Sequence, residues 1–156
     1  MLPRNGLTKE SNHKPVISLV VPVFNEQIGI RSTYETLVEL MESQGYPFEI
    51  IISDNGSTDD TEAILQQIAT RDTRCKYVRL SRNFGYQNNI TVGMAMAQGD
   101  AIIVIDSDLQ DPLELIPVFI GHWQEGHDVV YGIRIKRTGE SRLRVLMTML
   151  TRRTIS

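Results

Sequence analysis

Two aspartates, Asp106 and Asp108, stand two residues apart directly after the apolar run Ala101–Ile105. Carboxylates at this spacing, just past a buried strand, can offer oxygen ligands to one hard divalent cation. Mg²⁺ takes only one or two protein carboxylates and completes its coordination with water and substrate phosphates. The pair therefore predicts a metal site that works with a diphosphate, and Gln110 is placed to contribute. A bare Asp-x-Asp is common, and Gln110 and the neighbouring Asp111 could instead only begin the next helix.

Further polar side chains follow other apolar runs of the chain. Asn25 and Glu26 come directly after Val16–Phe24, and Asp54 comes just after Phe48–Ile52. In a parallel sheet these points lie along one carboxyl edge, where open α/β folds bind ligands. Each of them alone could be a helix cap or an ordinary turn. Acidic groups gathered at one edge repel one another, which favours a compensating cation there.

Two other groups carry potential chemistry. Ser81–Gly85 brings a cation, Arg82, and a tight turn to the same edge, where Arg82 either neutralises a phosphate or pairs with a surface acid. His122 and His127 are five residues apart with no third ligand evident nearby. We interpret both histidines as surface or helix-end residues without a metal role.

The elements that would position these residues alternate between strands and helices. Short apolar runs predict strands, and stripes of apolar residues at helical spacing predict the helices between them. The predicted strands are 16–24, 48–52, 76–80, 101–105 (buried on both faces) and 128–131. Four helices are predicted. The first ends near Gly45, with Ile30, Tyr34, Leu37, Val38 and Met41 on one stripe, and the second follows a cap at Asp59. The third covers 89–97, and the fourth runs from Pro112 to about Trp123. Short connections between them predict an α/β fold, a mainly parallel sheet with helices on both faces.

Composition limits the class of protein. The chain has 156 residues, of which 41% are hydrophobic and 22% charged, which suits one globular domain and excludes a disordered or fibrous chain. One cysteine, Cys75, excludes an intramolecular disulfide and fits a reducing compartment. No secretory signal is visible, and the longest apolar runs fall short of the ~18–20 residues that cross a bilayer.

Charge divides the chain unevenly. Residues 1–133 carry 9 basic and 18 acidic side chains, a net of −9, whereas 134–156 carry 7 basic and one acidic, a net of +6. This basic end predicts contact with phosphate or an anionic lipid surface, or it is simply a solvated helix. It lacks stacking aromatics, so nucleic-acid binding is not expected. We predict a polar tail over 1–15, a domain over 16–140, and the start of a basic amphipathic juxtamembrane helix over 141–156.

Four motifs in this order and spacing resemble family 2 glycosyltransferases with the GT-A fold. They are Val20–Glu26, Asp54–Asp59, Ser81–Gly85 and Asp106–Pro112. The last two, with Tyr131–Arg137 and Gly139–Ser141, look most like the polyprenyl-phosphate branch, which includes dolichyl-phosphate mannose synthase and undecaprenyl-phosphate glucosyltransferases. The resemblance covers about residues 16–150 and implies a GT-A fold, a Rossmann-like, mainly parallel sheet.

The resemblance assigns roles to individual residues. It implies that Pro22, Phe24, Glu26 and Asp54, together with Arg82, form the nucleotide site. Asp106 and Asp108, with help from Gln110, would hold Mg²⁺ or Mn²⁺, and Arg134 and Arg137 would meet phosphate of donor or acceptor. The catalytic set is then Asp106, Asp108, Arg134 and Arg137. Asn55 stands where the family often has a second aspartate, and Phe24 where tyrosine is common, which bears on base and sugar preference.

The implied reaction is metal-dependent, inverting transfer of a hexose from a nucleotide-diphosphate sugar to a polyprenyl phosphate, undecaprenyl or dolichyl. UDP-glucose is the favoured donor and GDP-mannose the second choice. The implied place is the cytoplasmic face of a membrane, and a homo-oligomer is left open. Members of this branch usually continue into further amphipathic and often transmembrane helices, so we expect a truncated chain whose full-length form is membrane-anchored.

Two alternatives come from other classes. Asp106-x-Asp108 also suits a haloacid-dehalogenase-type phosphatase, in which the first aspartate is a nucleophile. That pattern asks for Thr or Val where this chain has Gln110, and its aspartates follow the first strand rather than the fourth. The other alternative is a truncated fragment that binds nucleotide and metal without transferase activity.

Overall fold

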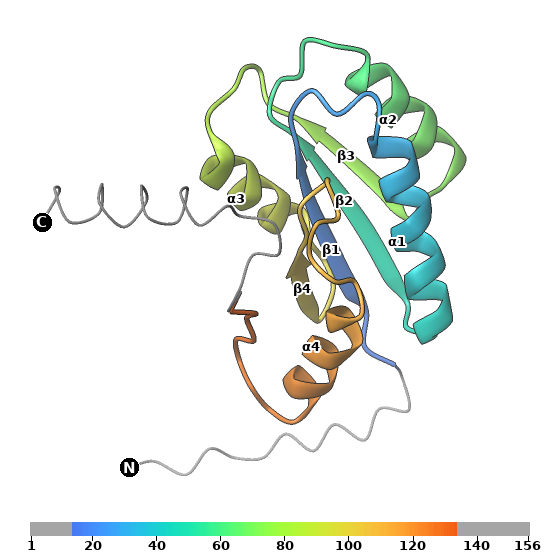
Figure 1. Ribbon diagram of the computed structural model, residues 1–156, viewed down its shortest axis with the longest axis vertical. Helices are drawn as coiled ribbons and strands as arrows, with labels where there is room; N and C mark the ends of the chain where they lie inside the picture. The colour runs from blue at the N-terminus through green and yellow to red at the C-terminus, as the bar shows by residue number, and fades with distance from the viewer. Residues whose placement is uncertain (1–13, 134–156) are drawn as a thin grey trace, which may run out of the picture.

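The computed structural model describes residues 14–133, and the structural statements below refer to this part of the chain. Strands and helices alternate along it (Figure 1). The elements are β1 (Ile17–Val23), α1 (Ile30–Gln44), β2 (Phe48–Asp54), α2 (Thr61–Arg71), β3 (Cys75–Arg79), α3 (Tyr86–Met96), β4 (Ala101–Val104) and α4 (Leu115–Gln124). The strands form one parallel sheet in the order β3-β2-β1-β4, which confirms the predicted α/β class.

The sheet is built in two directions from its central strand. From β1 the chain adds β2 and then β3 on one side, and afterwards returns to place β4 on the other side of β1. Parallel strands need a crossover connection, and α3 supplies the one that leads from β3 back to β4. The carboxyl ends of β1 and β4 therefore adjoin where the strand order reverses, the position at which such sheets bind ligands.

Helices cover both faces of the sheet, as predicted (Figure 1). Ile17, Leu19 and Val21 of β1 belong to one buried cluster with side chains of α1, α2 and α4. Val20 points to the other face, where it meets α3. Every residue of β1 is buried, which explains why this strand reads as a continuous apolar run rather than an alternating one.

α3 approaches the sheet closely because it carries a glycine at the contact. A Cβ placed on Gly93 would lie 2.5 Å from Cγ1 of Val20, closer than two carbon atoms can pack. Four residues earlier in the same helix, Asn89 is 2% exposed and faces the ends of β1 and β2. The side of α3 that faces the sheet thus carries Gly93, which allows close packing, and Asn89, which hydrogen-bonds to the strand ends.

The predicted element boundaries hold for α1 and shift elsewhere. α1 ends at Gly45 as predicted, with Ile30, Tyr34, Leu37 and Met41 buried. α3 begins at Tyr86 rather than Asn89, and α4 begins at Leu115, because Pro112 lies in the turn that precedes it. The cap of α2 is Asp60 rather than Asp59, although the Asp59 carboxylate accepts a hydrogen bond of 3.0 Å from the Thr61 N–H.

Two strand predictions were wrong. The run 101–105 was expected to be buried on both faces, but among the described strands β4 lies at the edge, and Ile102 and Val104 remain 40% and 39% exposed. Residues 128–131 form no strand, since they pair with no strand of the described chain, and Val129 and Tyr131 are 78% and 74% exposed. Apolar β-formers alone do not make a strand when no neighbour offers hydrogen bonds.

Within residues 14–133, none of the helices combines the length and apolar character that a bilayer span requires. The predicted juxtamembrane helix over 141–156 lies outside the described residues.

We predict that Gly93→Ala destabilises the domain. The added methyl group collides with Val20, and overpacking of this kind costs about 1–3 kcal/mol of unfolding free energy. Gly121→Ala in α4 is the matched control, because a Cβ at that position meets nothing within 4 Å. Glycine within a helix lowers stability by about 0.5–1 kcal/mol relative to alanine, so this change should not destabilise the domain. Urea denaturation followed by circular dichroism measures both. A Gly93→Ala variant as stable as the Gly121→Ala variant would contradict the close packing of α3.

Candidate functional site

A cleft of about 480 Å³ opens at the carboxyl ends of β1 and β4, where the strand order reverses. Loops that follow β1, β2, β3 and β4 all contribute to its walls, so segments far apart in sequence meet there. Its lining residues are Pro22, Val23, Phe24, Glu26, Asn55, Asn83, Gly85, Tyr86, Asn89, Asp106, Ser107 and Asp108.

The Asp106–Asp108 turn presents both carboxylates to this cleft. Asp106 and Asp108 are exposed, and the turn between them is held from behind by the Thr33 hydroxyl, which donates to the carbonyl oxygen of Ser107 at 2.7 Å. One oxygen of Asp108 accepts the backbone N–H of Gln110 at 3.2 Å, and the intervening Leu109 has a φ of 49°. Each carboxylate keeps a second oxygen on which no hydrogen bond from the described residues falls, which suits ligation of a divalent cation.

Tyr86 fixes the other carboxylate. Its hydroxyl donates to Oδ1 of Asp106 at 2.5 Å. Burial of the ring, followed by the hydrogen bond to Asp106, raises the pKa of Tyr86 to about 12. The hydroxyl is therefore protonated near neutral pH and acts as the donor of the pair.

The polar floor of the cleft is Asn89, which joins the strand ends. Its side-chain amide donates to the carbonyl oxygens of Ser53 at 2.8 Å and Val23 at 3.4 Å, and the Ser53 hydroxyl donates back to Asn89 Oδ1 at 2.6 Å. The Val23 carbonyl oxygen also accepts the Asn55 N–H at 2.9 Å, so Asn89 adds its hydrogen bonds where the β1–β2 ladder ends. An amide that offers donors and an acceptor satisfies both sides of this junction.

A second amide clamps the loop after β3. Asn55 is 5% exposed, its Nδ2 donates to Asn83 Oδ1 at 3.0 Å, and its Oδ1 accepts the Phe84 N–H at 2.9 Å. Asn83 Oδ1 also accepts the Gly85 N–H at 2.9 Å. An aspartate at position 55 would keep the acceptor and lose the donor. Asparagine at position 55, where the family often has aspartate, therefore has a structural role in this chain, because its amide ties the 83–85 loop to the end of β2.

Asp54 organises its own loop instead of lining the cleft. It is fully buried, and its Oδ1 accepts both the N–H and the hydroxyl of Ser57, at 2.9 and 2.6 Å. Its Oδ2 lies 3.5 Å from Nε of Arg79 and 3.4 Å from the Tyr77 hydroxyl. A carboxylate so fully engaged shapes the 54–57 turn, and the nucleotide contact that the resemblance implies for it stays a prediction.

The loop after β1 is pinned to the same turn. Asn25, with a φ of 56°, donates its backbone N–H to the Ser57 hydroxyl at 2.8 Å and accepts the Thr58 N–H at 2.8 Å. The Glu26 N–H donates to the Thr61 hydroxyl, also at 2.8 Å. These bonds use the backbone of Glu26 and leave its side chain at the cleft.

The structure thus brings together five of the predicted site residues: Pro22, Phe24, Glu26, Asp106 and Asp108 all line the cleft. Three others, Asp54, Arg82 and Gln110, are not among the lining residues. Arg82 places its guanidinium 4.7 Å from the centre of the Phe84 ring. Arg134 and Arg137 lie outside the described residues.

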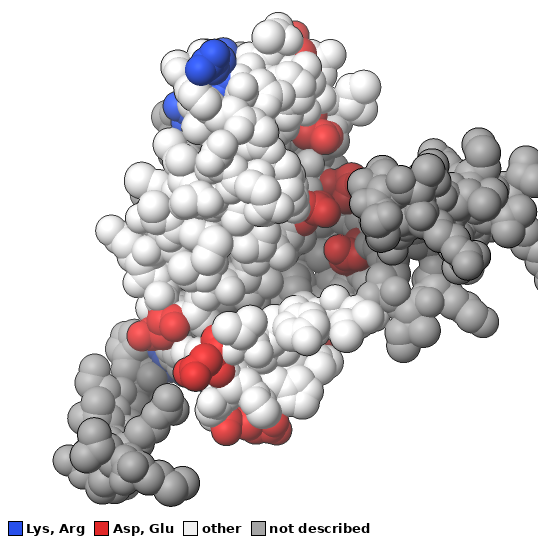
Figure 2. Space-filling view, turned by 90° about the vertical axis from the view of Figure 1, so that its left-hand side faces the viewer, with Lys and Arg blue, Asp and Glu red and all other residues white. Residues whose placement is uncertain are grey.

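Sequence reasoning missed the roles of Asn55, Asn83, Tyr86 and Asn89 in the cleft. One available signal was an amide at position 89 in a helix whose other sheet-facing residue is Gly93, since a buried amide needs partners. Figure 2 shows that acidic side chains predominate over basic ones on the face it presents, in agreement with the acidic count of residues 1–133.

We predict that Asn55→Asp loosens the clamp on the 83–85 loop. The carboxylate cannot donate to Asn83, and a buried group left without its partner costs about 1–3 kcal/mol of unfolding free energy. Gln87→Glu is the matched control, since Gln87 is exposed in the first turn of α3 and its side chain holds no part of the 83–85 loop, so the change shifts stability by only about 0.5 kcal/mol. Urea denaturation compares the two, and equal losses would refute the clamp.

The comparisons with known proteins bear on the family and the fold of the chain. The model of the glycosyl transferase family 2 matches residues 18–155. The "uncharacterized glycosyltransferase YkcC" of Bacillus subtilis is 48% identical over 124 residues, covering 80% of this chain and 38% of that protein. The "prophage bactoprenol glucosyl transferase homolog" of Escherichia coli is 44% identical over 128 residues, covering 82% of this chain and 42% of that protein. The chain thus spans about two fifths of the length of these relatives.

Among solved structures, a glucosyl-3-phosphoglycerate synthase from Mycobacterium tuberculosis, in complex with Mn²⁺, UDP and phosphoglyceric acid, superimposes with a TM-score of 0.57. It is 30% identical, and the match covers 74% of this chain and 41% of that one. The predicted GT-A architecture is confirmed by such neighbours together with the parallel sheet. The chain belongs to the glycosyl transferase family 2.

Proposed function

We propose that this chain is the nucleotide-sugar-binding domain of a metal-dependent, inverting glycosyltransferase that transfers a hexose to a polyprenyl phosphate. The observation that carries the proposal is the cleft at the strand-order reversal, whose lining includes Asp106 and Asp108 together with Phe24 and Glu26. A glycosyl donor combines a base, a sugar and a diphosphate, and this cleft offers an aromatic ring, hydrogen-bonding groups and paired carboxylates.

Each part of the donor has matching groups in the cleft. The ring of Phe24 is 42% exposed and offers a stacking surface for a base, with Pro22 and Glu26 beside it. Asp106 and Asp108 are the residues that would hold Mg²⁺ or Mn²⁺ against the diphosphate, Asp106 oriented by Tyr86. When bound, such an ion stabilises the charge that develops on the leaving nucleoside diphosphate. The solved relative that contains Mn²⁺ and UDP supports a divalent ion with a diphosphate at this type of site.

A phosphate acceptor explains how the reaction proceeds without a dedicated base. The second pKa of a phosphomonoester is ~6, so the acceptor is already mostly ionised near neutral pH. Orientation of the two substrates then supplies most of the barrier reduction. Direct attack on the face of the sugar opposite the leaving group inverts the anomeric centre. Relatives named bactoprenol glucosyl transferase support a polyprenyl phosphate acceptor and favour UDP-glucose over GDP-mannose as donor.

The basic segment gives the proposed acceptor a place. Residues 134–156 carry a net charge of +6, and we assign Arg134 and Arg137 to phosphate of the donor or the acceptor. Such a segment is attracted to the anionic surface of the cytoplasmic leaflet. We therefore place the enzyme at the cytoplasmic face of the membrane.

A second candidate function is nucleotide and metal binding without transfer. It is favoured by the cleft itself, whose lining residues all lie between Pro22 and Asp108 and offer groups for a nucleotide and a divalent cation.

We predict that UDP binds this chain in a Mn²⁺-dependent manner and that Asp108→Asn weakens this binding at least tenfold, a loss of about 1.4 kcal/mol. The amide removes one of two charged ligands without changing the shape of the turn. Glu39→Gln, an exposed change on α1, is the matched control and should leave the affinity unchanged. Isothermal titration calorimetry with and without Mn²⁺ measures the dissociation constants, with GDP as the alternative nucleotide. Equal affinity for both variants would exclude the aspartates from the site.

Transfer itself separates the two candidate functions. With UDP-glucose and undecaprenyl phosphate in detergent, the proposed enzyme should form glucosyl-phosphoryl lipid with the anomeric configuration opposite to that of the donor. Thin-layer chromatography detects the product, and its NMR coupling constants give the configuration. Nucleotide binding without any lipid product would favour the second candidate, and retention of configuration would overturn the proposed direct displacement.

A further inference from the structure

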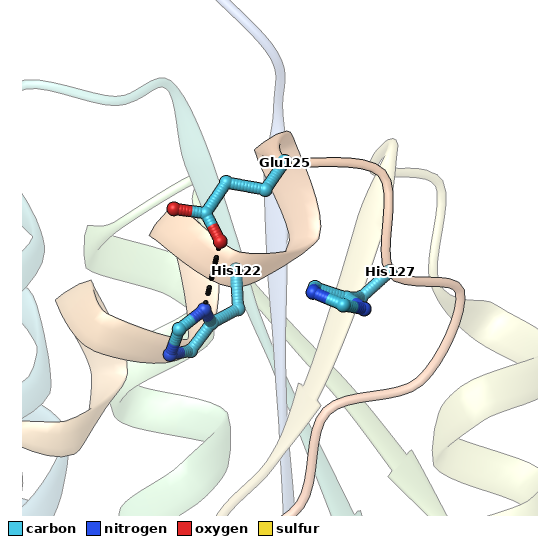
Figure 3. Close-up of side chains that lie close together, drawn as sticks. All are labelled: His122, Glu125 and His127. Atoms are coloured by element: carbon cyan, nitrogen blue, oxygen red, sulfur yellow. Dashed lines mark hydrogen bonds and ion pairs between the residues drawn. The ribbon is translucent and has the colours of Figure 1, made fainter.

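Three side chains at and just beyond the C-terminal end of α4 lie close together outside the cleft (Figure 3). His122 lies in α4, Glu125 is its C-cap residue, and His127 follows two positions later. Their potential ligand atoms all lie within 4.8 Å of one another. Both histidines are exposed, as predicted, but the expectation of no third ligand nearby was wrong, because Glu125 occupies that position.

The backbone brings His127 back over the helix end. Gly126 has a φ of 101°, which favours glycine, and its N–H donates to the carbonyl oxygen of Trp123 at 3.0 Å. The N–H of His127 then donates to the carbonyl oxygen of His122 at 3.3 Å. The two imidazole rings consequently meet edge to face, with their centroids 6.0 Å apart.

An ordinary surface ion pair does not account for the whole arrangement. Nδ1 of His122 lies 3.0 Å from a carboxylate oxygen of Glu125, and a pair of this kind between exposed side chains on one helix contributes little stability. The ion pair also does not involve His127, which the turn at Gly126 places beside His122 and Glu125. Together the three side chains offer two imidazole nitrogens and one carboxylate as possible metal ligands.

We propose that His122, Glu125 and His127 form a second metal site, selective for borderline transition ions such as Zn²⁺. Two imidazoles and one carboxylate are a set that Zn²⁺ takes, with an open fourth position for water. Ligands on one tetrahedral Zn²⁺ lie about 3.4 Å apart, so rotation of these exposed side chains is enough to close the site. The carbonyl groups at the C-terminus of α4 add a negative potential that favours a cation.

The two metal sites differ in the class of ion they select. Imidazole ligands favour Zn²⁺, Ni²⁺ or Cu²⁺, whereas the carboxylates of Asp106 and Asp108 favour Mg²⁺ or Mn²⁺. The ion at the end of α4 also cross-links the helix to the segment that starts at His127. That segment leads in sequence to Arg134, which the proposed function assigns to phosphate.

Metal titration of the untagged chain tests this site without nucleotide or lipid. We expect one Zn²⁺ to bind in competition with a chromophoric chelator while Mg²⁺ is in excess, and Co²⁺ to give the intense visible absorption of a four-coordinate complex. His122→Gln, Glu125→Gln and His127→Gln should each weaken Zn²⁺ at least about tenfold, since even indirect partners of a metal contribute that much. Circular dichroism verifies that these exposed variants remain folded.

Two controls make the outcome specific. His13→Gln removes the third histidine of the chain and should leave Zn²⁺ affinity unchanged, as should Asp108→Asn. Wild-type affinity in His127→Gln, or no Zn²⁺ binding by the wild-type chain, overturns the proposal. Loss of Zn²⁺ in Asp108→Asn would overturn it too, by assigning the ion to the aspartates. Because the assay contains no nucleotide, failure here leaves the proposed transferase function untouched.

Discussion

The return of the chain from β3 to the far side of β1 is the constraint on which the rest of the structure depends. It makes β1 the central strand, buried along its whole length, and it sends α3 across the face opposite α1 and α2. The return works only because α3 lies close to the sheet, with Gly93 against Val20 and Asn89 bonded to the ends of β1 and β2. The cleft is the space left above this junction.

Buried and exposed polar residues have different roles at the cleft. Asp54, Asn55 and Asn89 are at most 5% exposed, and they form hydrogen bonds within the protein that shape the loops. Asp106 and Asp108 are exposed and keep oxygens for an external partner. This division follows from desolvation, since a buried polar group needs partners within the fold while an exposed carboxylate can exchange water for a cation at little cost.

The sequence predicted most of the elements and the five residues that now line the cleft, because apolar periodicity and strand-end position are local signals. It failed where the outcome depends on a neighbour distant in the chain. The run at 128–131 has strand-like residues but no partner strand within residues 14–133, and Ile102 and Val104 are partly exposed because β4 lies at the edge of the described sheet. The partners of Asn55 and Asn89, and the approach of His127 to His122, likewise arise from packing and from turns that no spacing rule encodes.

The position of β4 also makes the pairing of the central strand depend on a distant part of the chain. Only one helix separates β1 from its neighbour β2 in sequence. The other edge of β1 pairs with β4, which comes after β2, β3 and three helices. Closing so long a loop is entropically costly, and contacts between distant segments form slowly. During synthesis β4 leaves the ribosome after β1, β2 and β3, and Asp106 and Asp108 follow it. The cleft therefore requires β4 in place, and a chain in which β4 is unpaired exposes an apolar edge of β1 on which other chains can aggregate.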